Sequence, residues 1–309
     1  QHAIFDGPHD YSKPMREAMY GFMTLHLKGE GTGEPIPEPK FETEKPDDLR
    51  CYPGDTRPKD FVTIPKFAAD EALRLHGREH IRWAKTLEGL LGGAPRGAPG
   101  DVRSETKGDT RTITFSPEPG ITLAATVEPA SGKGPLVVLL NLDGAAAARK
   151  GARYAALRKS GARVATLDLR TTGALAPGGE RVGRAPDHNS AEWGLWLGRP
   201  LAAQWVMDVI QFVRAEDVPA GAEVVLIGEG PAGVVALFTA AVAGGFGDPF
   251  PARITKVAAV DSLVSLVADQ PYTGQRLGLL VPGIVSQFGD LRTVVRACSH
   301  LRDDVAGGV

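Results

Sequence analysis

The sequence predicts an α/β fold in which helices cover both faces of a mostly parallel β-sheet, giving a three-layer sandwich. Two observations favour this fold class. From about residue 110 onward, short apolar runs rich in Val, Leu and Ile alternate with helical stretches, as expected for buried parallel strands and their crossover helices. Ahead of them, Thr110 to Val127 alternates apolar and polar residues around Pro119-Gly120, which is typical of a β-hairpin. A helical N-terminal extension precedes the hairpin.

The apolar runs define four expected strands, with helices between them. The strands are Pro135–Leu142, Ala162–Leu169, Ala222–Ile227 and Thr255–Val260, and the helices lie near 148–160, 198–216 and 231–245.

Before residue 101 the composition divides the chain into two parts. Residues 1–28 are expected to contain a helix from about Ser12 to Leu27, with Ser12 as its N-cap and a proline in its first turn. Residues 29–100 begin with a linker rich in Gly, Pro, Glu and Lys and continue into an amphipathic helix over 69–92. Together with residues 101–309, the chain therefore has three predicted parts.

Charge and composition exclude several functional classes. The chain has 35 basic and 37 acidic residues, a net charge of −2, and so lacks the basic balance of a nucleic-acid-binding protein. No apolar run approaches the roughly 18–20 residues that span a bilayer, and no signal peptide is recognisable, so no membrane partner is expected and the compartment stays open. Cys51 and Cys298 are too few for a disulfide framework or a cysteine metal cage.

Three loops carry motifs that point to chemistry. The predicted strand 222–227 runs into Gly228-Glu229-Gly230-Pro231-Ala232-Gly233 and then a helix, which is the setting of the nucleophile elbow G-x-S-x-G. This turn lacks the Lys-Ser/Thr of a phosphate-binding loop, so no nucleotide cofactor is expected. The predicted strand 135–142 ends in Asn141-Leu142-Asp143-Gly144, and the stretch Asp6-Gly7-Pro8-His9-Asp10-Tyr11 places a histidine between two carboxylates.

Together these motifs resemble the α/β-hydrolase fold, and more narrowly the bacterial acetylxylan-esterase-like proteins with two tandem hydrolase domains. The stretch Asp187-His188-Asn189-Ser190-Ala191-Glu192-Trp193 resembles part of the second domain of that group. The resemblance implies that residues 1–28 are the strand, histidine loop and helix that end a preceding hydrolase domain. It also implies that His9 corresponds to a catalytic histidine and that the loop at 141–144 contributes to an oxyanion hole.

The predicted elbow of this hydrolase-like domain is degenerate. Gly228 keeps the first glycine, but Gly230 stands where the serine is expected and Ala232 stands where the closing glycine is expected. Because glycine offers no nucleophile, the usual triad chemistry is not expected. Two functions follow: a hydrolase of small activated esters or phosphate esters that uses metal-activated water, or a non-catalytic pseudo-hydrolase domain that supports a carbohydrate (acetylxylan) esterase.

The metal hypothesis depends on the spacing His76-x-x-Glu79-His80. Two histidines four residues apart share one helix face and could ligate a single Zn²⁺, with Glu79 as the general base. The alternative interpretation is a charged helix whose histidines pack against apolar neighbours. The predicted cofactor is a divalent metal, Zn²⁺, and the predicted partner is a small-molecule ester.

Further ligands for this metal would come from other parts of the chain. His9 and His188 are the candidate ligands, and His9 and Asp187 are also candidate catalytic residues because each pairs an imidazole with a neighbouring carboxylate. The alternative for Asp187 and His188 is a loop that fixes the following helix through hydrogen bonds.

The N-terminal segment also suggests a mode of assembly. If residues 1–28 resemble the last elements of a hydrolase domain, they could cover an open sheet edge within one chain or by exchange between two chains. A homodimer formed through this segment is therefore a possible partner arrangement.

Overall fold

The computed structural model describes residues 2–54, 56–75, 83–92, 97–129, 134–216, 218, 222–243, 253–268 and 276–298. The chain divides into two compact units, Gln1–Phe61 and Val62–Val309, and the boundary falls inside the predicted segment 29–100. Within the described ranges, no helix is long and apolar enough to cross a membrane.

The first unit is a helix held by a return segment. α1, Lys13–Met23, continues as the π-helical η1, Thr24–Lys28, close to the predicted helix, whereas residues 2–12 are irregular. The return segment approaches so closely at Gly21 that a Cβ atom there would overlap the carbonyl of Glu34. The backbone N–H of Ile36 donates to the carbonyl of Glu17 at 3.0 Å, which fixes the segment along the helix.

Glu38 adds a side-chain connection between the same two segments. Its carboxylate accepts hydrogen bonds from Arg16 Nη2 at 2.8 Å and from the hydroxyl of Tyr20 at 3.0 Å. The Arg16 hydrogen bond is the main reason that the pKa of Glu38 falls to about 2. The carboxylate is therefore ionised over the whole physiological pH range.

In the second unit, the described strands form one seven-stranded sheet in the order β1-β2-β3-β5-β4-β6-β7. The strands are β1 (Gly100–Lys107), β2 (Thr110–Ser116), β3 (Leu123–Glu128), β4 (Leu136–Asn141), β5 (Arg163–Leu167), β6 (Glu223–Glu229) and β7 (Arg253–Val260). The predicted hairpin is β2–β3, and the four apolar runs are β4 to β7, so these predictions are confirmed.

The prediction of a mostly parallel sheet was wrong, because the sheet is mixed. β4–β5, β4–β6 and β6–β7 pair in parallel, whereas β1–β2, β2–β3 and β3–β5 pair antiparallel. The hairpin joins the same sheet because β3 pairs with β5. β1 pairs with β2 and adds one more strand at the edge of the sheet. β1 is exposed along its whole length and has Val102 as its one large apolar side chain, so it lacks the apolar alternation by which a strand is recognised in a sequence.

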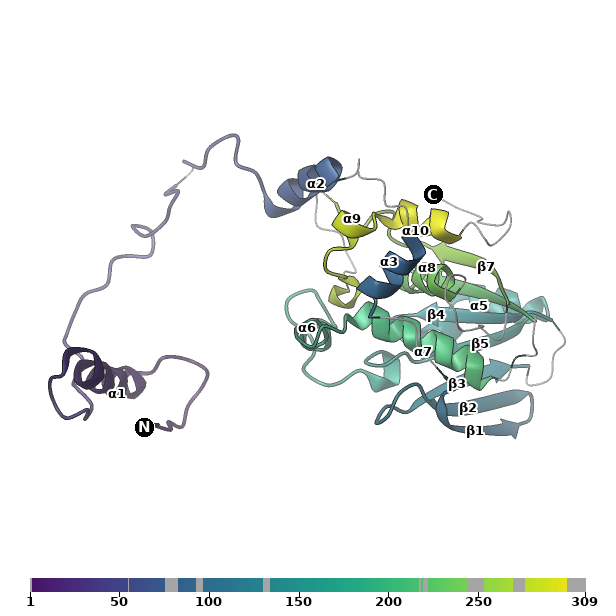
Figure 1. Cartoon of the computed structure of the whole chain (residues 1–309), viewed down its shortest axis with the longest axis horizontal. Helices are drawn as coiled ribbons and strands as arrows, with labels where there is room; N and C mark the ends of the chain where they lie inside the picture. The colour runs from purple at the N-terminus through teal and green to yellow at the C-terminus, as the bar shows by residue number, and fades with distance from the viewer. Residues whose placement is uncertain are drawn as a thin grey trace. The chain divides into compact units, whose positions relative to one another are not determined.

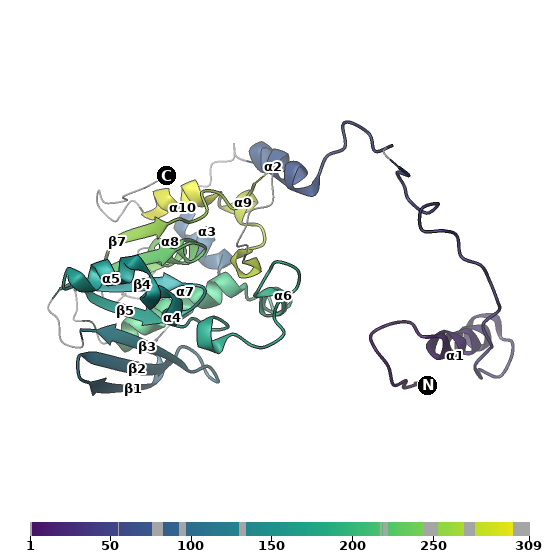
Figure 2. The same ribbon diagram turned by 180° about the vertical axis from the view of Figure 1, so that it is seen from behind.

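Helices cover both faces of this sheet. Figure 1 shows α7 and α8 on the near face, and Figure 2, from behind, shows α4 and α5 on the other. The described helices of the unit are α2 (Ile64–Leu75), α3 (Trp83–Leu90), α4 (Ala145–Lys150), α5 (Ala152–Lys159), α6 (His188–Trp196), α7 (Leu201–Ala215), α8 (Ala232–Ala243), α9 (Ile284–Gln287) and α10 (Leu291–Ala297), with 3-10 turns η2 (Gly173–Leu175) and η3 (Leu277–Leu279). The described parts of the helix predicted over 69–92 are α2, which begins earlier, and α3.

The alternation of side chains along β4 explains why two helical layers are needed. Val138 and Leu140 belong to a large core cluster with Trp205 of α7 and Phe238 of α8, whereas Leu139 belongs to a separate cluster that includes Ala148 of α4. Successive strand residues point to opposite faces, so a strand that is apolar at every position must be covered on both.

Candidate active site

The carboxyl ends of the parallel strands meet at one edge of the sheet. Asn141, the last residue of β4, pairs with Glu229 of β6, and Glu229 pairs with Val260 of β7. The loops that follow these three strands therefore start side by side. Ligands of open α/β sheets bind at this edge, so it is where a hydrolase site is expected.

The elbow after β6 has the predicted strand–turn–helix backbone. Gly230 adopts the left-handed region with φ +56°, and its N–H donates to the carbonyl of Val260 at 2.8 Å. A Cβ atom on Gly228 would overlap the carbonyl of Ala232, and one on Gly233 would overlap the side chain of Ser262. The close approach that demands glycine thus falls at Gly228 and Gly233. Gly233 lies one residue beyond Ala232, the position that the motif assigns to the closing glycine.

Gly230 itself has room for a side chain but carries none. Apart from Gly230 and its two chain neighbours, no described residue has an atom within 4 Å of the position that a Cβ would take there. Its neighbour Glu229 forms an ion pair with Arg153, with 3.3 Å between Oε1 and Nε. The turn therefore keeps the geometry of a nucleophile elbow without a nucleophile.

The loop after β4, which the resemblance assigned to an oxyanion hole, is closed by internal hydrogen bonds. The N–H of Asp143 donates to Asn141 Oδ1 at 2.8 Å, and the N–H of Gly144 donates to the carbonyl of Asn141 at 2.9 Å. The N–H of Ala145 donates to Asp168 Oδ1 at 2.7 Å. An oxyanion hole needs such N–H groups aimed at the substrate, and here all three are occupied.

Asp187 is buried and acts on the backbone rather than on an imidazole. Its carboxylate accepts the N–H groups of Leu277 at 3.0 Å and Gly278 at 2.9 Å, which fixes the turn η3. His188 begins α6, and its Nδ1 lies 3.3 Å from Asn189 Oδ1 and 3.9 Å from the Glu192 carboxylate. Asp187 therefore holds the distant turn η3, and its side chain does not cap α6, the following helix that the alternative interpretation named.

The predicted metal ligands are spread over both units and over residues outside the described ranges, so the structure does not test whether they share a metal ion. His9 lies in an exposed bend of the first unit, and His188 lies in the second. His76, Glu79 and His80 lie outside the described residues, so the zinc site they would form stays a prediction. Over the described ranges, no three His, Cys, Asp or Glu side chains gather closely enough to hold a metal ion.

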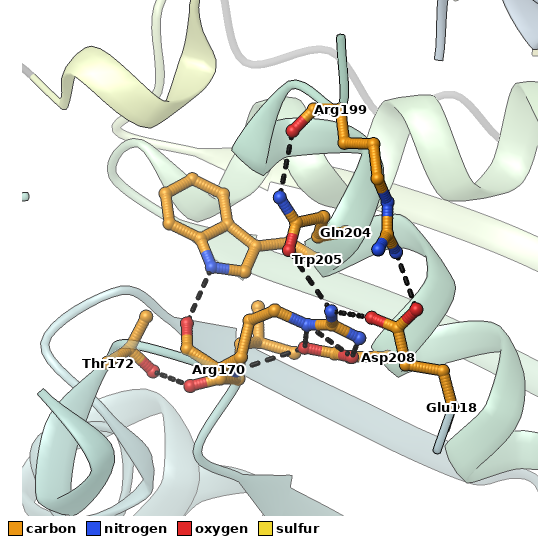
Figure 3. A network of polar contacts seen from close by, with 8 residues as sticks. Glu118, Arg170, Thr172, Arg199, Gln204, Trp205 and Asp208 are labelled. Carbon is orange, nitrogen blue, oxygen red and sulfur yellow. Dashed lines mark hydrogen bonds and ion pairs between the residues drawn. The ribbon is translucent and has the colours of Figure 1, made fainter. Parts of the chain in front are cut away.

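A buried ionic network at the same edge was not predicted (Figure 3). Arg170, just beyond β5, donates from Nη2 to Asp208 Oδ1 at 2.6 Å and from its backbone N–H to Asp208 Oδ2 at 3.0 Å. Its Nη1 binds Glu118 of the β2–β3 turn and Gln204 Oε1, the latter at 3.1 Å. Trp205 Nε1 donates to the carbonyl of Arg170 at 2.9 Å, so the network joins β5, α7 and the hairpin turn.

The charges of Arg170 and Glu118 are stabilised within this network, whereas burial of Asp208 outweighs its hydrogen bonds from Arg170 and raises the pKa of its carboxyl. Burial alone would lower the pKa of Arg170, but its hydrogen bonds with Asp208 and Glu118 outweigh burial and raise this pKa. Burial also opposes ionisation of Glu118, yet the hydrogen bonds from Arg170 and Arg199 bring the pKa of its carboxyl below the ordinary value. The sequence signal that could have found Asp208 is its position as the one acidic residue of the otherwise largely apolar α7.

No family model matches the sequence, and no curated protein matches it significantly. Solved structures do match. A "putative acetyl xylan esterase" from Bacteroides fragilis NCTC 9343 aligns with a TM-score of 0.50 at 14% identity, over 78% of this chain and 67% of that one. The catalytic domain of a glucuronoyl esterase from Hypocrea jecorina aligns with a TM-score of 0.41 at 14% identity, over 75% and 65% of the two chains.

A third solved structure is acetyl xylan esterase 1 from Thermoanaerobacterium sp. JW/SL YS485. It aligns with a TM-score of 0.35 at 14% identity, over 58% of this chain and 59% of that one. This chain therefore spans between 59% and 67% of the three structures. The likeness to the Bacteroides fragilis structure, together with the sheet order, shows that the second unit has an α/β fold of the same kind as that structure. The tandem arrangement of two hydrolase domains stays a prediction.

Proposed function

We propose that this chain takes part in the hydrolysis of ester bonds in carbohydrates, and that its α/β-hydrolase-fold unit is a non-catalytic pseudo-hydrolase domain supporting a carbohydrate (acetylxylan) esterase. The observation that carries the proposal is the elbow at Gly230, where the backbone turn is kept and the attacking side chain is absent. Because acyl transfer by a triad starts from that nucleophile, the reaction has no first step at this turn.

The loop after β4 supports the same proposal independently of the elbow. Asp168 and Asn141 accept the N–H groups of Ala145, Asp143 and Gly144, which would otherwise be free to stabilise a tetrahedral oxyanion. Loss of a single oxyanion donor costs an esterase or protease about 10²–10³ in kcat. The unit thus lacks two elements of the catalytic machinery, and each loss alone would suppress turnover.

The substrate class is proposed from the Bacteroides fragilis structure, whose description names an acetyl xylan esterase. One surface feature fits a carbohydrate partner. Trp193 and Trp196 lie three residues apart on α6, and they are 53% and 74% exposed. Flat indole faces exposed on one helix can stack on the C–H faces of sugar rings, whereas most tryptophans are largely buried.

The test compares ester cleavage with ligand binding. With the purified chain we expect no release of acetate from acetylated xylo-oligosaccharides, and no cleavage of p-nitrophenyl acetate above the rate with bovine serum albumin. We expect the oligosaccharide to change the tryptophan fluorescence, and a variant with both Trp193→Ala and Trp196→Ala to lose that change.

Ester cleavage by the chain would contradict the proposal, and a chelator would show how. A rate that EDTA abolishes and Zn²⁺ restores would support the predicted metal-activated water, with His76→Ala and His80→Ala as the variants to examine next. A rate insensitive to EDTA would instead indicate a nucleophile elsewhere in the chain.

A further inference from the structure

A cavity of about 360 Å³ lies beside the loop after β7 and the segment that starts at Arg276. Arg276 is the one charged residue among its described lining residues. The others are Ala, Leu, Val and Ile, and they include Leu266, Leu277, Leu280, Ile284 and Val285. A volume of this size falls in the range of roughly 300–1,000 Å³ that is usual for small-molecule sites.

Among the described residues, the guanidinium of Arg276 uses only part of its hydrogen-bonding capacity. Its side chain is only 13% exposed, and its one partner among the described residues is Asp143, bound through Nη2. A guanidinium carries five N–H donors, so most of them have no described acceptor. Asp143 is 72% exposed, and an ion pair with so exposed a carboxylate is worth little.

The backbone beside Arg276 is held firmly. The N–H groups of the next two residues, Leu277 and Gly278, donate to the buried carboxylate of Asp187. A Cβ on Gly278 would overlap the ring of Trp205, so the segment packs tightly against α7. The direction in which Arg276 leaves the backbone is therefore set before any ligand binds, which lowers the entropic cost of binding.

We propose that this cavity binds a small carboxylic acid with an apolar body, the carboxylate on Arg276 and the hydrocarbon part against Leu266, Leu280 and Val285. The planar guanidinium matches a carboxylate in a two-point geometry, and apolar walls strengthen that interaction by excluding water. The ligand carboxylate takes the place of Asp143, which turns into solvent.

This inference goes beyond the proposed function, because it concerns a free acid rather than an ester and requires neither a nucleophile nor a sugar. Asp143, the partner of Arg276, nevertheless lies in the loop after the strand that neighbours the elbow strand in the sheet. Asp143 follows β4 by two residues, and the last residue of β4 pairs with Glu229 of the elbow strand.

The test uses benzoate as the probe with the full chain at pH 7, by titration calorimetry. We expect saturable binding of benzoate, and binding at least about tenfold weaker for benzyl alcohol, which has the same ring without the charge, and for acetate, which has the charge without the ring. Arg276→Gln should weaken benzoate binding at least about tenfold. Asp143→Asn should strengthen it about threefold or more, because the competing carboxylate is gone.

Arg103→Gln is the matched control, since Arg103 is an exposed arginine of β1 and should leave benzoate affinity unchanged. Val285→Trp should fill the cavity and abolish binding without a change of charge. The proposal is overturned if wild-type protein shows no saturable binding up to about 10 mM benzoate. It is equally overturned if benzyl alcohol binds as tightly as benzoate. It is also overturned if Asp143→Asn weakens binding. These outcomes hold even if Arg276→Gln fails to fold.

Discussion

Replacing Asp208 by alanine should destabilise the second unit by several kcal/mol. Asp208 is fully buried in α7 and accepts hydrogen bonds from the side chain and the backbone N–H of Arg170. Without it, Arg170 keeps its charge in a buried position and loses its main partner. Removing one member of a buried ion pair costs about 3–5 kcal/mol, because the other charge is left uncompensated.

The structure places this variant at the lower end of that range. Glu118 and Gln204 still bind Nη1 of Arg170 after Asp208 is gone, so the charge is not left entirely without partners. We therefore expect a loss of about 3 kcal/mol. For a unit of this size each kcal/mol lowers the melting temperature by about 2–4 °C, which gives a decrease of about 6–12 °C.

Thermal and urea unfolding followed by circular dichroism measure this loss. Asp109→Ala is the control, because it removes an exposed carboxylate paired with Arg158 and should cost less than about 0.5 kcal/mol. The double variant Asp208→Leu with Arg170→Met removes both charges and should recover most of the stability, since no buried charge remains unpaired. The reasoning is refuted if Asp208→Ala costs under about 1 kcal/mol, or if the double variant is as unstable as the sum of its single changes.

Three further predictions concern the elbow and the first unit. Gly230→Ser should fold, with a free energy of unfolding about 1–2 kcal/mol lower because serine must adopt a left-handed backbone conformation. A fluorophosphonate probe should not label this variant. Strong labelling would show that a working base is already in place. Gly233→Ala should destabilise the unit by overlap with Ser262, measured by urea unfolding, and adding Ser262→Gly should recover part of the loss; no recovery would contradict the overlap. The folded pKa of Glu38, about 2 beside Arg16, lies below its unfolded value. Its contribution to stability is therefore present at neutral pH and lost as pH falls from about 4.5 toward 2. NMR titration of the carboxyl checks this, and a midpoint near 4.5 would contradict it.

The parallel half of the fold could be predicted from the sequence because burial on both faces leaves a continuous apolar run. β4 is such a run, and its side chains enter two separate cores. β1 could not be predicted, because its residues Gly100–Lys107 are exposed throughout and its pairing depends on the neighbouring hairpin. The sheet was therefore expected to be mostly parallel when it is mixed.

In the candidate site, too, one part could be predicted from the sequence and another could not. The turn at Gly230 follows from local spacing of glycines and was predictable. The roles of Asp187 and Asp208 were not, because their partners are distant in sequence: the separation is 90 residues from Asp187 to Leu277 and 38 residues from Arg170 to Asp208. A carboxylate next to a histidine indicates a catalytic pair in sequence, and only the fold shows that the Asp187 carboxylate holds backbone N–H groups instead.

The surroundings of Asp168 limit how the elbow of this unit could take part in ester cleavage. Gly144 and Gly173 both have positive φ angles and approach each other so closely that a Cβ on either would overlap the other residue and Asp168. With its carboxylate bound to Ala145 and its surroundings this crowded, Asp168 cannot be moved aside by a small shift of one loop. A serine at position 230 would find no free N–H donors at Asp143, Gly144 and Ala145. Triad-type ester cleavage at this elbow would therefore require coordinated changes in two strand-end loops, and a library that varies position 230 alone should yield no variant with that activity.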